Sequence, residues 1–158
     1  MDNVLQLIMK HPQMSLEDIA SMMGLTFNEV QDIINEYQQK KIIRGYRPII
    51  DTTMCDHPYV SALIEVKTNP KKDVGFDEII QVVSHYPEVE SVYLMAGEYD
   101  LAVFVLAESM MDIANFVSSR LATLDGVMST STRFVLKKYK ELGIHFQQQT
   151  DNREKMSV

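Results

Sequence analysis

The chain has 158 residues, a formal net charge of -7 and 46% hydrophobic residues, which excludes an intrinsically disordered chain and accommodates one ordinary domain or two small ones. Its single cysteine, Cys55, excludes an internal disulfide and indicates a reducing compartment. Because neither a signal sequence nor an apolar run of about 18 residues is recognisable, we expect a cytoplasmic protein with no membrane partner.

Three short helices are predicted in the first part of the chain. Apolar side chains at helical spacing predict a helix over residues 3–10, which ends before Pro12 because proline disfavours helix at the preceding residue. Ser15 begins a second helix that stops at Gly24, and Thr26 caps a third. Two helices separated by a tight turn with glycine predict a helix-turn-helix.

The pattern changes after the third helix. β-branched and aromatic residues with a glycine and a proline over residues 42–51 predict an edge strand or hairpin wing that leads out of the first domain. Beyond it, alternating or continuous apolar residues predict strands, and helical spacing predicts helices. Their order is strand (59–67), helix (74–87), strand (88–97), strand (99–107), helix (109–126) and strand (127–140).

This order predicts a ferredoxin-like βαββαβ domain whose two helices cover one face of an antiparallel sheet. The strand over residues 99–107 is almost wholly apolar, which predicts a central position. We expect a second copy of the chain to cover the other face in a sheet-on-sheet dimer that buries about 2,000 Å². Apolar residues for both faces are expected from Val92, Leu94, Val103, Val105 and residues 130–134.

The sequence therefore predicts an α+β protein with two domains. Residues 1–50 are expected to form a winged helix-turn-helix DNA-binding domain that ends in a wing or linker strand. Residues 51–146 are expected to form an αβ sensing and oligomerisation domain, and residues 147–158 a polar tail.

Three segments resemble the Lrp/AsnC (leucine-responsive, or feast/famine) family of transcription regulators. IASMMGLTFNEVQDIINEYQQKKIIRGYRPIID resembles the family's helix-turn-helix and wing, YPEVESVYLMAGEYDLAVFV the core of its C-terminal ligand-binding (RAM) domain, and STSTRFVLKKYKELG its last strand. The resemblance implies a homodimer that can associate into an octamer or another even assembly. It also implies double-stranded promoter DNA as partner and an amino acid or related metabolite as small-molecule effector.

The third helix carries the candidate DNA contacts, because the second helix of a helix-turn-helix enters the major groove. Asn and Gln can pair with adenine, an aromatic ring can touch a thymine methyl, and the basic cluster after the helix can hold phosphates. For each polar residue, a merely solvated helix face remains the alternative. The candidates are Thr26, Phe27, Asn28, Gln31, Asn35, Lys40, Lys41, Arg44 and Arg47.

The third helix departs from the family pattern in its charge. The family usually places Arg or Lys in this helix, whereas residues 26–39 contain neither and carry Glu29, Asp32 and Glu36. This departure leaves a second interpretation open. The chain could be a metabolite-binding or partner-binding module whose DNA binding is weak or lost.

The segment Gly97–Asp100 is the candidate effector site, at a turn between two strands expected in the middle of the sheet. Backbone amides and the Tyr99 hydroxyl can hold a carboxylate, and the carboxylate of Glu98 or Asp100 can hold an ammonium group. The resemblance places the effector pocket at Met95, Ala96, Gly97, Glu98, Tyr99, Asp100, Thr130 and Thr132. The alternative is a structural hairpin in which Asp100 caps the backbone.

No pattern in the sequence predicts catalysis, a bound metal or a cofactor. The four histidines lack metal-ligand spacing, and no nucleophile elbow or phosphate-binding glycine loop is present. Sirohaem decarboxylases share this architecture, but they need basic residues and histidines to hold many carboxylates. Here the C-terminal part is acidic and its only arginines are Arg120, Arg133 and Arg153, so we expect a protein that is not an enzyme.

Overall fold

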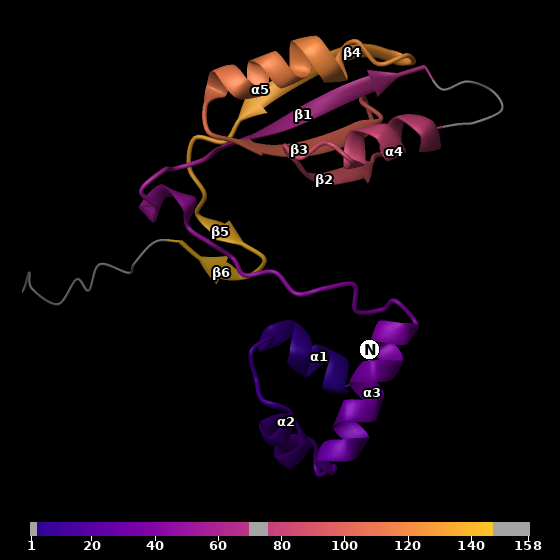
Figure 1. Cartoon of the computed structure of the whole chain (residues 1–158), viewed down its shortest axis with the longest axis vertical. Coiled ribbons are helices and arrows are strands. Elements are labelled where there is room, and N and C mark those ends of the chain that lie inside the picture. The colour runs from indigo at the N-terminus through magenta and orange to yellow at the C-terminus, as the bar shows by residue number, and fades with distance from the viewer. Residues whose placement is uncertain (1–2, 70–75, 147–158) are drawn as a thin grey trace, which may run out of the picture. The chain divides into compact units, whose positions relative to one another are not determined.

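The computed structural model describes residues 3–69 and 76–146, and the chain divides into two compact units after Pro48 (Figure 1). The first unit contains α1 (Asn3–Lys10), α2 (Leu16–Met23) and α3 (Phe27–Gln39), so the three predicted helices are confirmed. None of the described helices is long and apolar enough to cross a lipid bilayer.

Local hydrogen bonds set the boundaries of α2. The Ser15 hydroxyl accepts a hydrogen bond from the N–H of Asp18 at 3.1 Å and so caps the first turn. Gly24 ends α2 in the left-handed conformation, with φ at 66°, which a residue without a Cβ adopts without strain. The helices then pack around a small aliphatic core formed by Val4, Ile8, Ile19, Ala20, Val30 and Ile34.

The wing predicted over residues 42–51 is wrong, because the described chain has no strand there. Extended backbone becomes a strand only when its N–H and C=O groups pair with a neighbouring strand. The N–H groups of Ile42 and Ile43 instead donate to the Tyr37 carbonyl oxygen, at 2.8 and 3.2 Å, and close the end of α3. Pro48 has no N–H to donate, and the segment is an irregular linker.

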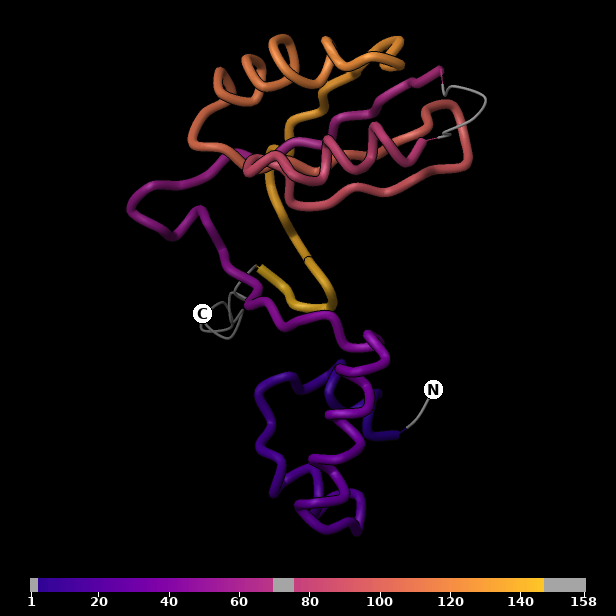
Figure 2. Tube along the Cα trace, turned by 45° about the vertical axis from the view of Figure 1, so that its right-hand side comes forward, coloured from indigo at the N-terminus to yellow at the C-terminus, as the bar shows by residue number. Residues whose placement is uncertain are grey.

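The second unit contains a sheet of four antiparallel strands in the order β2-β3-β1-β4. This order and pairing confirm the ferredoxin-like arrangement and the central position of the third predicted strand. Figure 2 lets the chain be followed from β2 through its loop into β3. The elements are β1 (Val60–Thr68), α4 (Asp77–Ser84), β2 (Val89–Leu94), β3 (Leu101–Ala107), α5 (Met110–Phe116) and β4 (Val127–Phe134). The first residues predicted for α4 and the predicted tail lie outside the described residues.

The apolar residues are distributed over the two faces of the sheet differently from what the sequence predicts. Paired residues of neighbouring strands share a face, and Val92 pairs with Val103 while Leu94 pairs with Leu101. All four, together with Val105, therefore point to the face that α4 and α5 cover, where Val92, Leu101, Val103 and Val105 belong to the hydrophobic core and Leu94 stays 58% exposed. Apolar residues of the open face are Leu63, Ala102, Phe104, Leu106 and Tyr93.

The helix predicted over residues 109–126 is shorter than expected. Ser109 caps α5 as predicted, but α-helical geometry ends at Phe116 and a π-helical turn (Val117–Leu121) follows. In that turn the hydroxyl of Ser119 donates to the carbonyl of Asn115, and such bonds compete with regular helix geometry.

The last strand is also shorter than predicted. The ladder of β4 with β1 ends at the pair of Phe134 with Ala62, although the N–H of Val135 still donates to the Ser61 carbonyl oxygen at 2.9 Å. A small hairpin of β5 (Lys140–Glu141) and β6 (Ile144–His145) follows.

Candidate functional site

The start of α3 is a capping box. The Thr26 hydroxyl accepts a hydrogen bond from the N–H of Glu29 at 3.3 Å, and a carboxylate oxygen of Glu29 accepts from the N–H and hydroxyl of Thr26 at 2.7 and 2.8 Å. Both hydrogen bonds that the Glu29 carboxylate accepts lower its pKa, and the bond from the Thr26 backbone N–H has a larger effect than the bond from the Thr26 hydroxyl. The predicted DNA contact Thr26 thus has a structural task at the helix start.

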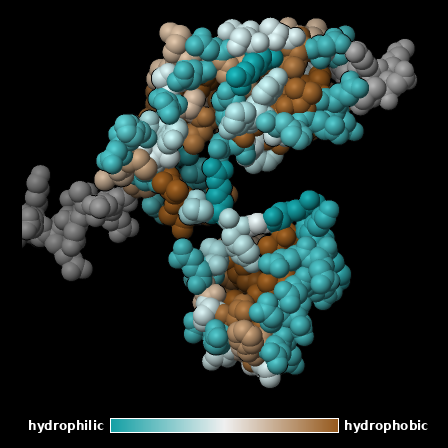
Figure 3. Space-filling view, viewed as in Figure 1, coloured by the Kyte–Doolittle hydropathy of each residue, from teal (hydrophilic) through white to brown (hydrophobic). Residues whose placement is uncertain are grey.

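The outer side of α3 presents polar side chains. Val30 and Ile34 are buried against the other two helices, which leaves Asn28, Asp32 and Asn35, at i, i+4 and i+7, exposed along the opposite side. Figure 3 shows that this side of the helical unit is hydrophilic. Such amides match adenine edges, and a carboxylate accepts from the amino group of cytosine.

Two further predicted contacts flank this stripe. The Gln31 amide donates to the side-chain oxygen of Asn35 at 3.3 Å, which orients both amides. Phe27, 44% exposed at the first turn, leaves part of its ring accessible. α3 therefore offers hydrogen-bonding groups and one aromatic ring on its outer side.

The basic cluster after α3 is partly engaged within the chain. The Lys40 ammonium pairs with the Glu36 carboxylate one helical turn earlier, and Arg44 Nε donates to the carbonyl oxygen of Lys41 at 2.9 Å. Both partners of the Lys40–Glu36 pair are exposed, and such pairs stabilise by only about 0.3–0.5 kcal/mol. A phosphate group can therefore compete for Lys40. Lys41, Arg44 and Arg47 are all exposed.

The loop over residues 95–100 joins β2, an edge strand, to the central β3, so it does not join two central strands as expected. Asp100 anchors the end of this loop. One of its carboxylate oxygens accepts from the N–H of Thr68 at 2.7 Å and from the Thr68 hydroxyl at 3.2 Å. Its own N–H donates to the Val66 carbonyl oxygen at 3.0 Å, and its carbonyl oxygen accepts from the N–H of Met95 at 2.7 Å. Asp100 thus caps the backbone of β1.

Sequence reasoning missed Lys67 at this loop. Its ammonium donates to the carbonyl oxygen of Glu98 at 2.7 Å and lies 3.8 Å from the other carboxylate oxygen of Asp100. The ferredoxin-like order already contained the signal, since it pairs the end of β1 with the start of β3. A lysine at the end of β1 is therefore placed beside the loop that precedes β3.

The eight predicted effector residues do not form one pocket within a single chain. Thr130 and Leu101 pair with Val66 from opposite sides. Because neighbouring strands lie about 4.8 Å apart, Thr130 is about 10 Å from the start of β3, with β1 between them. Thr132, on the same strand as Thr130, pairs with Ile64. The loop and β4 are thus two separate parts of the predicted site.

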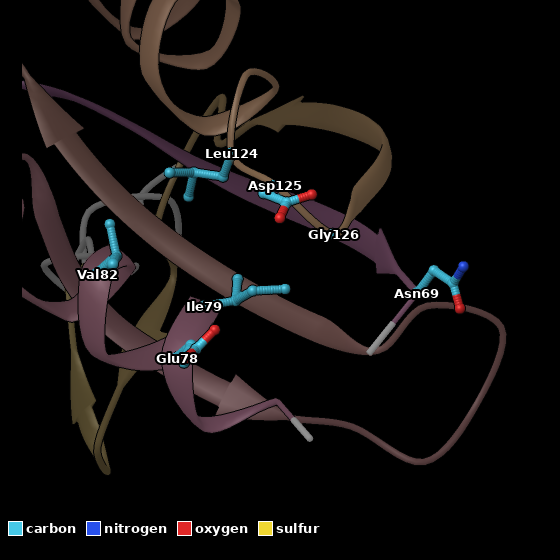
Figure 4. A pocket seen from close by; sticks show the side chains of 7 residues that line it. All are labelled: Asn69, Glu78, Ile79, Val82, Leu124, Asp125 and Gly126. Atoms are coloured by element: carbon cyan, nitrogen blue, oxygen red, sulfur yellow. The ribbon is translucent and has the colours of Figure 1, made fainter. Parts of the chain in front are cut away.

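A separate hollow of about 210 Å³ lies between α4 and the segment just before β4 (Figure 4). Side chains of α4 and of the segment before β4 line it, and none of the predicted effector residues does. Gly126, one of its lining residues, has φ at 87°, which favours glycine, and a Cβ there would lie 3.0 Å from Ile79 Cδ1, so that the Ile79 side chain would have to shift. The lining residues are Asn69, Glu78, Ile79, Val82, Leu124, Asp125 and Gly126.

Known proteins match the chain along most of its length. The Lrp/AsnC ligand binding domain matches residues 61–144. The HTH-type transcriptional regulator YugG of Bacillus subtilis is 45% identical over 151 residues, which cover 95% of this chain and 91% of that protein. The leucine response regulatory protein LrpA of Mycobacterium tuberculosis has a similar fold, with a TM-score of 0.76 at 21% identity over 93% of this chain and 100% of that one. The regulator NMB0573 of Neisseria meningitidis, solved with L-methionine, has a TM-score of 0.71 at 22% identity over 89% and 93% of the two chains.

Proposed function

The chain belongs to the Lrp/AsnC family of transcriptional regulators, and we propose that it binds promoter DNA in the cytoplasm as a homodimer or larger even oligomer, under the control of an amino acid or related metabolite. The observation that carries this proposal is one chain in which a helix-turn-helix with an exposed polar α3 precedes the family's ligand-binding domain. Its named relatives are transcriptional regulators and not enzymes, so the sirohaem decarboxylase alternative has no support.

Each of the two units is proposed to carry one function. Residues 1–50 bind DNA, and residues 51–146 sense the effector and hold the oligomer together. α3 enters the major groove with Asn28, Gln31 and Asn35, while Lys40, Lys41, Arg44 and Arg47 contact phosphates. Thr26 supports this surface by capping α3, and the ring of Phe27 can touch a thymine methyl.

The homodimer is proposed to form through the open face of the sheet. Tyr93 is 53% exposed and Phe104 is 40% exposed, and their rings meet edge to face with centroids 5.9 Å apart. Large apolar side chains on a sheet face are stabilised when a second sheet packs over them. A second copy supplies such a face by two-fold symmetry.

The effector is proposed to bind at the loop over residues 95–100. The separation of this loop from Thr130 and Thr132 by β1 favours a site that is completed by another copy of the chain. Ligand binding would then be coupled to oligomerisation, because the ligand contacts groups from two chains only in the assembled form. An amino acid is the proposed class, since NMB0573 was solved with L-methionine.

The acidic α3 favours one alternative, a metabolite-binding or partner-binding module that has lost DNA binding. Fluorescence anisotropy with the chain's own upstream region and with a shuffled duplex of equal composition separates the two functions. At about 50 mM salt a regulator binds its own region more tightly, and its affinity falls steeply as salt rises because phosphate contacts release counterions. Equal and negligible binding of both duplexes would instead support the module.

A further inference from the structure

We propose that Lys67 binds the carboxylate group of the effector and so selects effectors that carry one. This inference rests on the proposed function, since it adds a residue to the effector site. Lys67 comes from β1, whereas the loop it contacts joins β2 to β3. Its ammonium is held over the loop by the carbonyl oxygen of Glu98, at 2.7 Å.

The Lys67 ammonium has hydrogen-bonding capacity left for a ligand. An ammonium group carries three N–H donors, and the Glu98 carbonyl takes one of them. The nearer Asp100 carboxylate oxygen lies at 3.8 Å, beyond hydrogen-bond distance, so it attracts the charge without taking a donor. The Lys67 side chain is 45% exposed, and a small molecule at the loop can reach the remaining donors.

The nearby carboxylate of Asp100 does not remove this capacity. One Asp100 oxygen accepts from both the N–H and the hydroxyl of Thr68, which holds the carboxylate in place at the end of β1. It therefore cannot swing over the ammonium without losing both bonds. The Glu98 carboxylate is exposed on the same loop. A positive and a negative group at one loop match the two charges of an amino acid.

The position of Lys67 on the sheet strengthens the assignment. Successive residues of a strand point to opposite faces, and Val66 and Thr68 are buried on the covered face. Lys67 consequently projects from the open face, which carries Tyr93 and Phe104. When a second copy excludes water there, attraction between the ammonium and a bound carboxylate increases because the effective dielectric constant falls.

The test compares each amino acid with its uncharged carboxamide. The full-length protein is screened by thermal shift and calorimetry against the twenty standard L-amino acids, and the tightest binder is then compared with its amide. The amide keeps the ammonium group and side chain but lacks the negative charge. We expect the wild type to prefer the acid by about tenfold or more, and Lys67→Gln to prefer it by less than about threefold.

Two further variants separate charge from structure. Lys67→Arg keeps a cation and is expected to keep most of the preference, while Lys140→Gln makes the same charge change in β5 and is expected to leave it unaltered. An unchanged preference in Lys67→Gln, or equal loss in a folded Lys67→Arg, overturns the role of Lys67 and leaves the effector site standing. Absence of binding by any amino acid to the wild type overturns the effector site and the inference together.

Discussion

Asp100 and Thr68 are joined by two hydrogen bonds across 32 positions of sequence, from the backbone N–H of Thr68 at 2.7 Å and from its hydroxyl at 3.2 Å. Thr68 is only 5% exposed, so removal of the acceptor leaves buried donors without a partner. Asp100→Ala is therefore expected to lower the free energy of unfolding by about 1–3 kcal/mol, the usual cost of an unsatisfied buried group. Urea unfolding followed by circular dichroism measures this change.

The matched control is Glu98→Ala, which removes an exposed carboxylate from the same loop and is expected to change stability by less than about 0.5 kcal/mol. Asp100→Asn keeps one acceptor oxygen and is expected to fall between the two. Equal stability of the Asp100→Ala and Glu98→Ala variants would contradict the anchoring role of Asp100.

Gly126→Ala is expected to destabilise the second unit by about 1–2 kcal/mol. Gly126 has φ at 87°, where a Cβ is strained, and the added Cβ would lie 3.0 Å from Ile79 Cδ1. Gly97→Ala, in the same unit, is the control, since φ there is not positive and nothing lies within 4 Å of the added Cβ. Thermal unfolding of the two variants provides the comparison, and equal midpoints would show that neither strain nor crowding matters at Gly126.

The capping box makes the stability of the helical unit depend on pH. Hydrogen bonds from Thr26 lower the pKa of Glu29 below its ordinary value of 4.5 in the folded chain. The charged carboxylate therefore stabilises the fold above the pKa it has when unfolded, and this contribution is lost as pH falls through the lower, folded pKa. The wild type should unfold at a higher temperature than Glu29→Ala at pH 7, with a difference that shrinks below about pH 4.

Circular dichroism melts of both proteins between pH 7 and pH 2 measure that difference, and subtraction cancels the titration of all other shared groups. Glu29→Gln is a useful companion, because glutamine can still accept from the Thr26 N–H but does not titrate. A gap between wild type and Glu29→Gln that stays constant with pH would argue against a lowered pKa.

Local signals in the sequence predict most of the fold. Ser15, Gly24 and Thr26 are capping residues whose role depends only on neighbours in sequence, and the helices they bound are confirmed. The wing over residues 42–51 failed because its apolar, β-branched pattern describes a strand without saying which strand would pair with it. The end of β4 at Phe134 likewise depends on its pairing with β1, a strand far away in sequence.

The candidate site shows the same division. Asn28 and Asn35 could be placed on the outer side of α3 from helical spacing alone, and the structure exposes both. To predict which residues lie on which face of the sheet, one needs the register of β2 against β3. This register shifts at an irregularity between Val89 and Ser91. Lys67 was missed because its importance comes from a loop more than thirty positions away, a contact that no local pattern records.

Phe104→Asp is expected to convert the proposed dimer into a monomer that remains folded. A charge placed on the open face would be buried without a partner in a sheet-on-sheet interface, at a cost of several kcal/mol. Phe104 is 40% exposed in the single chain, so the isolated fold tolerates the change. Met111→Asp introduces the same charge on α5, where the side chain is 67% exposed. Sedimentation velocity distinguishes the variants, and a dimeric Phe104→Asp would exclude the open face as the interface.

Asn28 and Lys41 are expected to contribute to DNA binding in different ways. Asn28 lies in the first turn of α3, where its amide can pair with adenine, so Asn28→Ala should reduce the preference for the chain's own upstream region by about 1–3 kcal/mol. Lys41 follows α3 and is exposed, so Lys41→Gln should weaken binding to all duplexes alike and lower the slope of log K against log salt by about 1. Anisotropy titrations at several salt concentrations measure both effects. If Asn28→Ala weakened binding to the chain's own upstream region and to the shuffled duplex equally, the amide would contribute affinity without reading bases. The outer side of α3 would then lose its role in specificity.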